Sequence, residues 1–132
     1  MNGVVSLLGN EHYRMVEALW QELEVRFGVR GVYVTPYPHF SYQIAEHYAE
    51  SKLEAALARF AVAQSAFTVR TAGLAAFTGP QPVIYVAVVR DRALSDFHLR
   101  LCDAILGMGT GLSPYYNDKF WMPHVTIGFG DI

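Results

Sequence analysis

The spacing of apolar residues changes along the chain, and each spacing predicts a helix or a strand. A short apolar run at 4–8 predicts a strand, and Asn10 is placed to cap the helix that follows. Gly28 is a typical residue for the end of this helix. One face of the helix is apolar at spacings of three and four residues: Val16, Leu19, Trp20, Leu23 and Phe27. Further strands are predicted at 32–34 and 39–44.

The remaining chain continues this alternation of helices and strands. Ser51 and Glu54 have the spacing of a capping box, and the helix that they begin has an apolar face at Leu53, Leu57, Phe60 and Ala61. Strands are predicted at 67–77 and 83–89, with a turn at 78–82 between them. The apolar face of a third helix consists of Leu94, Phe97, Leu101 and Ile105. The glycines at 107, 109 and 111 predict a flexible loop before the last strand.

The order strand, helix, strand therefore occurs twice, starting at Val4 and again at Val83. This duplicated strand-helix-strand architecture predicts an α+β fold with mostly antiparallel sheets. We expect a single domain, 1–132, made of two lobes at roughly 1–78 and 79–132. A pseudo-two-fold axis between the lobes would bring the last strand of each repeat to a central cleft.

Composition and charge limit the partners of the chain. The 132 residues are 52% hydrophobic and 17% charged, which is typical of a compact soluble protein. The net charge is −2 and no basic stripe is visible, so we expect neither DNA nor long RNA as a ligand. No apolar run approaches the ~18 residues of a membrane span and no signal peptide is visible, so we expect no membrane partner. Together with the single Cys102, this favours a cytoplasmic protein.

Two short motifs share one pattern. His39 follows a proline and precedes Ser41 by two positions, and His124 follows a proline and precedes Thr126 by two positions. No other histidine in the chain has either feature. In a strand, residues two apart lie on the same face, about 7 Å from each other, while the residues between them point to the opposite face. Each motif therefore presents an imidazole and a hydroxyl side by side.

This pattern suits the handling of a phosphate. Two opposed imidazoles form a general acid and base pair: one takes a proton from the attacking oxygen and the other gives a proton to the leaving oxygen. We expect His39 and His124 to face one cleft with their imidazoles roughly 5–8 Å apart, which leaves room for one phosphate. Ser41 and Thr126 would then donate hydrogen bonds to the phosphate oxygens. The scheme needs no cofactor and no metal, and neither motif has a carboxylate or thiol at ligand spacing.

Several aromatic and basic side chains are further candidates for substrate binding. The cluster Tyr115-Tyr116 and Phe120-Trp121 precedes the second motif, and it could stack a base or cover the end of the core. Tyr42 and Tyr85 could line the cleft or pack inside the protein. Three cations are candidates for phosphate contacts: Arg70, Arg90 and Lys119.

The two motifs resemble those of the two-histidine phosphoesterases, which include 2′-5′ RNA ligase-like proteins and cyclic nucleotide phosphodiesterases. The family hallmark is a pair of His-x-Ser/Thr motifs, each on a strand of one of two similar lobes, and the resemblance covers nearly the whole chain. It implies metal-independent hydrolysis, or in some members ligation, at a 2′,3′-cyclic phosphate or a 2′-5′ linkage. It also implies that His39 and His124 are catalytic and that Ser41 and Thr126 hold the phosphate.

The second lobe differs from the family pattern because the sequence stops within six residues of Thr126, whereas family members commonly continue with a helix and a strand. We therefore expect a lobe that is shortened at its C-terminus, either as a compact variant or as a lobe covered by a partner chain in a homodimer. The leading hypothesis is a hydrolase acting on 2′,3′-cyclic phosphates of nucleotides or short RNA ends in RNA processing. The alternatives are an RNA end-joining enzyme and a nucleotide- or RNA-binding module without turnover.

Overall fold

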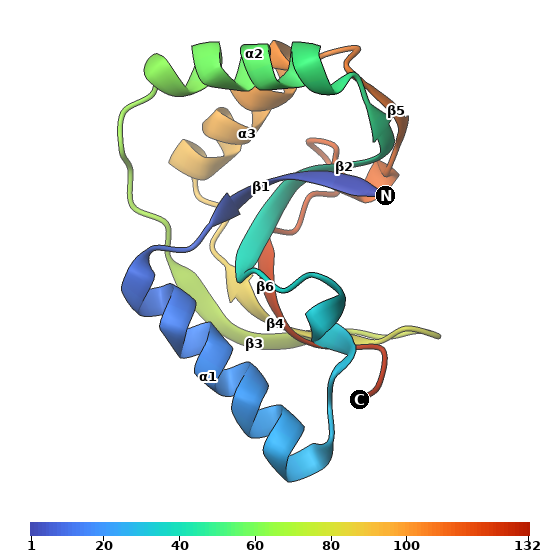
Figure 1. Cartoon of the computed structure of the whole chain (residues 1–132). Coiled ribbons are helices and arrows are strands. Elements are labelled where there is room, and N and C mark those ends of the chain that lie inside the picture. The colour runs from blue at the N-terminus through green and yellow to red at the C-terminus, as the bar shows by residue number, and fades with distance from the viewer. The chain divides into compact units, whose positions relative to one another are not determined.

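The computed structural model describes all residues, 1–132, and shows the α+β class that the sequence predicts (Figure 1). The helices are α1 (Asn10–Phe27), α2 (Glu50–Val62) and α3 (Arg92–Ala104), and two 3-10 helices are η1 (Gly31–Val34) and η2 (Pro114–Tyr116). The strands are β1 (Asn2–Leu7), β2 (His39–Tyr48), β3 (Thr71–Phe77), β4 (Val83–Val88), β5 (Gly109–Leu112) and β6 (His124–Phe129). They form two three-stranded sheets, in the orders β1-β2-β5 and β3-β4-β6. No helix has both the length and the apolar character that crossing a membrane requires.

The chain forms two compact units that do not coincide with the predicted lobes at 1–78 and 79–132. The first unit contains residues 1–4, 41–70 and 90–122, and the second contains residues 5–40, 71–89 and 123–132. The difference arises from strand pairing, because β3 pairs with β4 and β5 pairs with β2. Each half of the sequence thus contributes one strand to the sheet of the other half.

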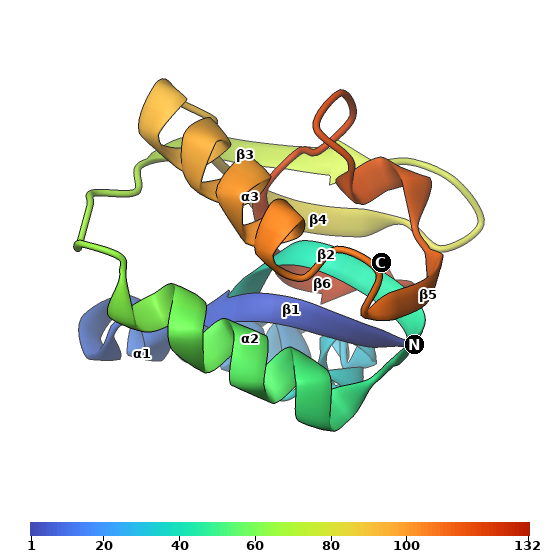
Figure 2. The same cartoon turned by 90° about the horizontal axis from the view of Figure 1, so that it is seen from above.

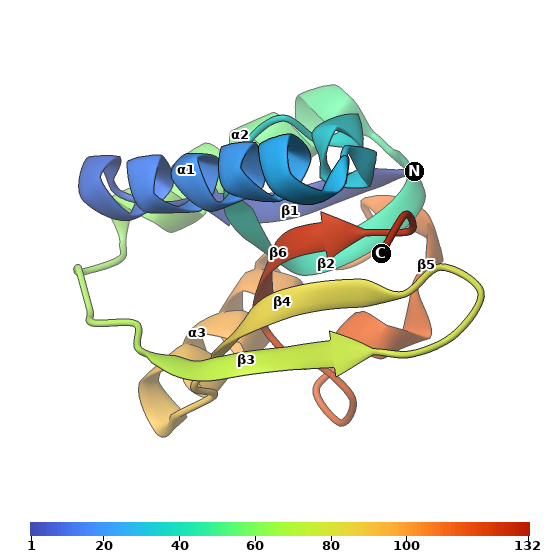
Figure 3. The same cartoon turned by 90° about the horizontal axis from the view of Figure 1, so that it is seen from below.

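The second unit is built on the sheet β3-β4-β6, in which β4 is the central strand (Figure 3). Strand β4 runs antiparallel to both neighbours, and the predicted turn at 78–82 joins β3 to β4. Helix α1 packs against β6 through its apolar face, on which Val16 and Trp20 are buried. The helix ends at Gly28, which adopts a left-handed conformation (φ 72°) that glycine accommodates without strain.

The first unit contains helices α2 and α3, which pack on each other (Figure 2). Several aromatic side chains of this unit cluster around Phe97 of α3. The ring of Phe97 lies 5.1–5.4 Å, centroid to centroid, from the rings of Phe67, Phe60 and Tyr42. Strand β5 pairs with the end of β2, from Ala45 to Tyr48.

Strand β5 corrects the prediction of a flexible loop at 107–114. A Cβ atom on Gly109 would lie 2.9 Å from the ring of Tyr48, and one on Gly111 would lie 2.6 Å from the side chain of Glu46. These glycines therefore let β5 approach β2 closely. The role of these two glycines depends on residues more than 60 positions away in the sequence. The local sequence therefore cannot distinguish glycines that permit close strand packing from glycines of a flexible loop.

The N-caps of the first two helices also differ from those predicted by the sequence. Gly9, not Asn10, is the N-cap of α1, and Ala49 is the N-cap of α2, so Ser51 lies inside the first turn. Neither cap makes a side-chain hydrogen bond. Of the three helices, only α3 has a side-chain cap, in which Asp91 accepts a hydrogen bond from the Leu94 amide at 2.9 Å.

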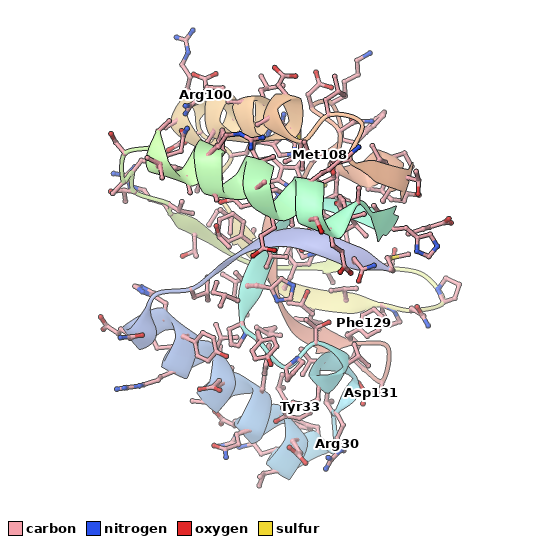
Figure 4. All side chains as sticks on the ribbon, turned by 45° about the horizontal axis from the view of Figure 1, so that its top comes forward. Arg30, Tyr33, Arg100, Met108, Phe129 and Asp131 are labelled. Carbon is pink, nitrogen blue, oxygen red and sulfur yellow. The ribbon has the colours of Figure 1, made fainter.

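The predicted strand at 32–34 is instead the 3-10 helix η1, whose start is bonded to the end of the chain. The carboxylate of Asp131 accepts hydrogen bonds from the backbone amides of Arg30 at 2.6 Å and Gly31 at 2.8 Å. Figure 4 shows Asp131 beside Arg30. In addition, the Gly130 amide donates to the Pro82 carbonyl at 2.8 Å. The residues after β6 thus attach this strand to η1 and to the β3–β4 turn.

The Asp131 carboxylate gives stability a dependence on pH in the acid range. Its hydrogen bonds, the one from the Arg30 amide first, lower its pKa below the ordinary 3.8. A carboxyl group whose pKa is lower in the folded state stabilises the fold above its unfolded pKa, and this contribution is lost as the pH falls through the folded pKa. We expect Asp131→Asn to lower the melting temperature at neutral pH and to reduce its decline in acid. Thermal unfolding followed by circular dichroism across this range tests the expectation, and parallel curves for the two proteins would contradict it.

Candidate functional site

The first motif occupies the start of β2 and shows the predicted alternation of faces. His39 and Ser41 are half-buried, while Phe40 and Tyr42 are 5% and 4% exposed. The apolar face of the strand therefore lies in the core, and the imidazole and the hydroxyl share the more accessible face.

The second motif occupies the start of β6 and repeats this pattern. His124 and Thr126 are half-buried, while Val125 and Ile127 are 4% and 6% exposed. The two motifs are therefore equivalent in burial as well as in sequence, which supports the duplication inferred from the order of elements.

The proline of each motif has the same hydrogen bond in the two repeats. The Pro38 carbonyl accepts from the Leu8 amide at 3.3 Å, and the Pro123 carbonyl accepts from the Val88 amide at 3.0 Å. Leu8 follows β1 and Val88 ends β4, the first strand of each repeat. Each motif is thus attached, one residue before its histidine, to the end of the strand that opens its repeat.

The tautomer of His39 follows from its hydrogen bond. Its Nδ1 lies 2.5 Å from the Tyr37 carbonyl, and a carbonyl can only accept, so Nδ1 carries the proton and donates it. In the neutral ring, Nε2 then has the free lone pair. Nε2 is therefore the atom through which His39 can take up or release a proton in a reaction.

The ring of His124 lies against two aromatic side chains of its own sheet. Its centroid is 5.0 Å from that of Tyr85 and 5.1 Å from that of Phe77, with the Phe77 ring edge-on at 82°. Phe77 and Tyr85 stack on each other at 4.3 Å. This packing restricts the rotation of the imidazole, as a proton-transferring group requires.

Three of the four motif residues belong to the same compact unit: His39, His124 and Thr126. Ser41 belongs to the other unit, in which β2 continues beyond Phe40. Because Ser41 lies two residues after His39 on one strand, both side chains still project from the same face of β2.

The other candidates for substrate binding divide by exposure. Tyr42 and Tyr85 are each 4% exposed. Tyr42 packs beside Trp121, whereas Tyr85 lies against both Phe77 and His124, and a substrate contact for either stays a prediction. Tyr115 is 74% exposed and Lys119 is also exposed, so their side chains are accessible, and a substrate contact for them stays a prediction.

Arg90, a candidate for a phosphate contact, has a structural role. Its guanidinium donates to the carbonyls of Trp121, at 3.0 Å, and Asp118, and it lies 5.7 Å from the centroid of the Trp121 ring. With the bond from Nε to Ser95 Oγ, these contacts use three of the five N–H donors and hold the guanidinium against the protein. Arg70 remains exposed.

The structure also shows a buried histidine that the sequence did not single out. His98 is 1% exposed, stacks on Trp121 at 3.9 Å, and its Nε2–H donates to the Tyr42 carbonyl at 2.9 Å. Burial lowers the pKa of His98, so the ring is neutral at neutral pH. As a single histidine within a predicted helix, His98 carries no sequence pattern that separates a surface position from a core position.

No group of three or more His, Cys, Asp or Glu side chains is arranged to hold a metal ion. The residues of the two motifs offer proton transfer through imidazoles and hydrogen-bond donation through hydroxyls, which together suit chemistry at a phosphate.

Comparison with known proteins agrees with this chemistry. A family model described as the 2′-5′ RNA ligase superfamily matches residues 13–131, a range that includes both motifs. No curated protein and no solved structure matches the chain.

Proposed function

The chain belongs to the 2′-5′ RNA ligase superfamily, and on that premise we propose that it is a phosphodiesterase that hydrolyses the 2′,3′-cyclic phosphates of nucleotides or short RNA ends. The observation that carries this proposal is the equivalence of the two motifs. Each has a half-buried histidine and hydroxyl residue on one face of a strand, backed by two buried residues. Both motifs are intact, which favours catalysis over binding alone.

In the proposed reaction one imidazole, acting as a base, removes a proton from water while the water oxygen attacks phosphorus. The bond from phosphorus to the 2′ or 3′ oxygen breaks, and the second imidazole, acting as an acid, gives its proton to that oxygen. The product is a ring-opened phosphomonoester. His39 would act through Nε2, because Nδ1 is bound to the Tyr37 carbonyl. That the two imidazoles face one phosphate stays a prediction.

The acidic balance of the chain favours a small substrate. A net charge of −2 offers no extended basic surface for the backbone of long RNA. Hydrolysis of nucleotides and short ends therefore fits the charge better than the joining of long RNA strands, the alternative to which the family description points.

The proposed reaction is tested by offering 2′,3′-cyclic nucleotides and short RNA ends that carry a cyclic phosphate, with and without EDTA. We expect phosphorus NMR to show the ring-opened monoester at the same rate in both conditions, because the motifs supply acid, base and hydrogen-bond donors. Activity that is lost in EDTA and restored by a divalent ion would overturn the metal-independent mechanism. Affinity for a nucleotide without turnover would favour the binding module, and joined ends would favour the ligase.

The hydroxyl residues are expected to contribute less than the histidines. Ser41→Ala or Thr126→Ala should each remove about 1–3 kcal/mol of transition-state stabilisation, since one hydrogen bond to a charged oxygen is lost. The measurement is kcat/KM on the best substrate of the panel. Ser51→Ala, an exposed serine in the first turn of α2, is the matched control and should keep the wild-type rate. Wild-type activity in both motif variants would show that the hydroxyls do not hold the phosphate.

A further inference from the structure

The two tryptophans of the chain make equivalent hydrogen bonds to the two motifs. The indole Nε1–H of Trp121 donates to the main-chain carbonyl of Ser41 at 2.8 Å. The indole Nε1–H of Trp20 donates to the main-chain carbonyl of Thr126 at 3.0 Å. The chain has no further tryptophan, so both of its indoles hold the hydroxyl residue of a motif.

These carbonyls accept hydrogen bonds from side chains where strand pairing is incomplete. Strand β6 is an edge strand of its sheet, so the carbonyls on its outer side have no strand to bond with. Strand β2 pairs with β5 only from Ala45 onward, so the part of β2 that contains Ser41 lies beyond that pairing. Each indole therefore supplies a donor to its motif strand at a residue that lacks a paired strand on one side: Thr126 of the edge strand β6, and Ser41, which precedes the part of β2 that pairs with β5.

Packing fixes the position of each indole. Trp20 is 3% exposed, and its ring meets that of Tyr33 edge-on at 5.9 Å. Trp121 is 2% exposed, stacks on His98 and lies beneath the guanidinium of Arg90. A buried indole N–H needs a hydrogen-bond partner, but any nearby carbonyl could serve. Both indoles bond to the carbonyl of the hydroxyl residue of a motif, so these hydrogen bonds do more than satisfy a buried donor.

We propose that Trp20 and Trp121 are matched positioning residues, which orient the hydroxyls of Thr126 and Ser41 toward the substrate phosphate. This inference rests on the proposed function. Holding a carbonyl restrains its peptide plane, and this plane together with the preceding one sets the direction of the Cα–Cβ bond between them. Because a group that stabilises charge in a transition state must be held to within about 0.5 Å, a small rotation of this plane lowers its contribution.

A double-mutant cycle on activity tests the proposal. Trp121→Phe keeps an aromatic ring and removes the N–H, and we expect it to lower kcat/KM by about 5- to 20-fold in the wild type and in Thr126→Ala. In Ser41→Ala it should lower kcat/KM by less than about 2-fold, because the hydroxyl that it positions is already absent. Trp20→Phe should lower kcat/KM in the wild type and in Ser41→Ala, but by less than about 2-fold in Thr126→Ala.

A purely structural role predicts another result: each Trp→Phe change would reduce activity by the same factor in all three backgrounds, and this would overturn the proposal. Circular dichroism shows which variants are folded at the assay temperature. If a Phe variant does not fold, tryptophan is replaced at the same position by benzothienylalanine, which keeps the size of the indole and lacks the N–H. The same double-mutant cycle is then measured with this analogue.

The cycle can also be read without turnover, which separates this inference from the proposed reaction. If the wild type cleaves no cyclic phosphate but binds adenosine 2′- or 3′-monophosphate, the phosphodiesterase is wrong, and the dissociation constant replaces kcat/KM in the cycle. The same pairing of Trp121 with Ser41 and Trp20 with Thr126 is then expected in affinity. A wild type that neither cleaves nor binds these nucleotides would overturn both proposals.

Discussion

Replacing His39 or His124 with alanine is expected to lower kcat by about 10²–10⁴-fold, because each imidazole supplies one proton transfer in the proposed reaction. KM should change much less, since the imidazoles act mainly in the transition state. The measurement is steady-state kinetics on the cyclic phosphate that the wild type cleaves fastest.

His47→Ala is the matched control for this result, because His47 lies on the same strand, β2, and is exposed. It should retain the wild-type rate. Both motif histidines are half-buried, so their alanine variants should stay folded, which circular dichroism can verify. Near-wild-type turnover in either motif variant would contradict paired-histidine catalysis.

Replacing Gly31 with alanine is expected to destabilise the fold by ~2–4 kcal/mol. A Cβ atom at this position would lie 1.8 Å from the carbonyl oxygen of Phe129 and 2.8 Å from Asp131 Oδ1. Because the nearest atom belongs to the backbone of β6, relief requires movement of η1 or of the strand that begins with His124. The measurement is the free energy of unfolding from urea denaturation.

Gly9→Ala serves as the comparison, since a Cβ atom there meets nothing within 4 Å and the backbone is extended, with a φ of −65°. It should cost no more than about 1 kcal/mol, the preference of a helix N-cap for glycine over alanine. Equal free energies of unfolding for the two variants would show that β6 and η1 can move apart without loss of stability. If Gly31→Ala also lowers the activity of the folded protein, the attachment at the end of β6 contributes to the placement of His124.

The local features of this protein could be predicted from its amino-acid sequence alone. Period-two alternation predicted which residues of each motif strand are buried, and the structure confirms that Phe40, Tyr42, Val125 and Ile127 lie in the core. The α+β class and the superfamily could likewise be predicted from the repeated order of elements and from the two motifs. These predictions succeed because side chains on a strand or helix face alternate with a fixed local period.

The tertiary structure decided which strands pair and which side chains hold the motifs. Sequence periodicity does not encode the partner of a strand, so the exchange of β3 and β5 between the two halves could not be predicted. In the same way, the carboxylate of Asp131 bonds the backbone amides at the start of the 3-10 helix 31–34 from about 100 positions away along the chain, a contact that local sequence does not reveal. Trp20 lay on a predicted apolar helix face and Trp121 in an aromatic cluster with two possible roles. The direction of an indole N–H depends on the carbonyls that packing brings beside it, here those of Thr126 and Ser41.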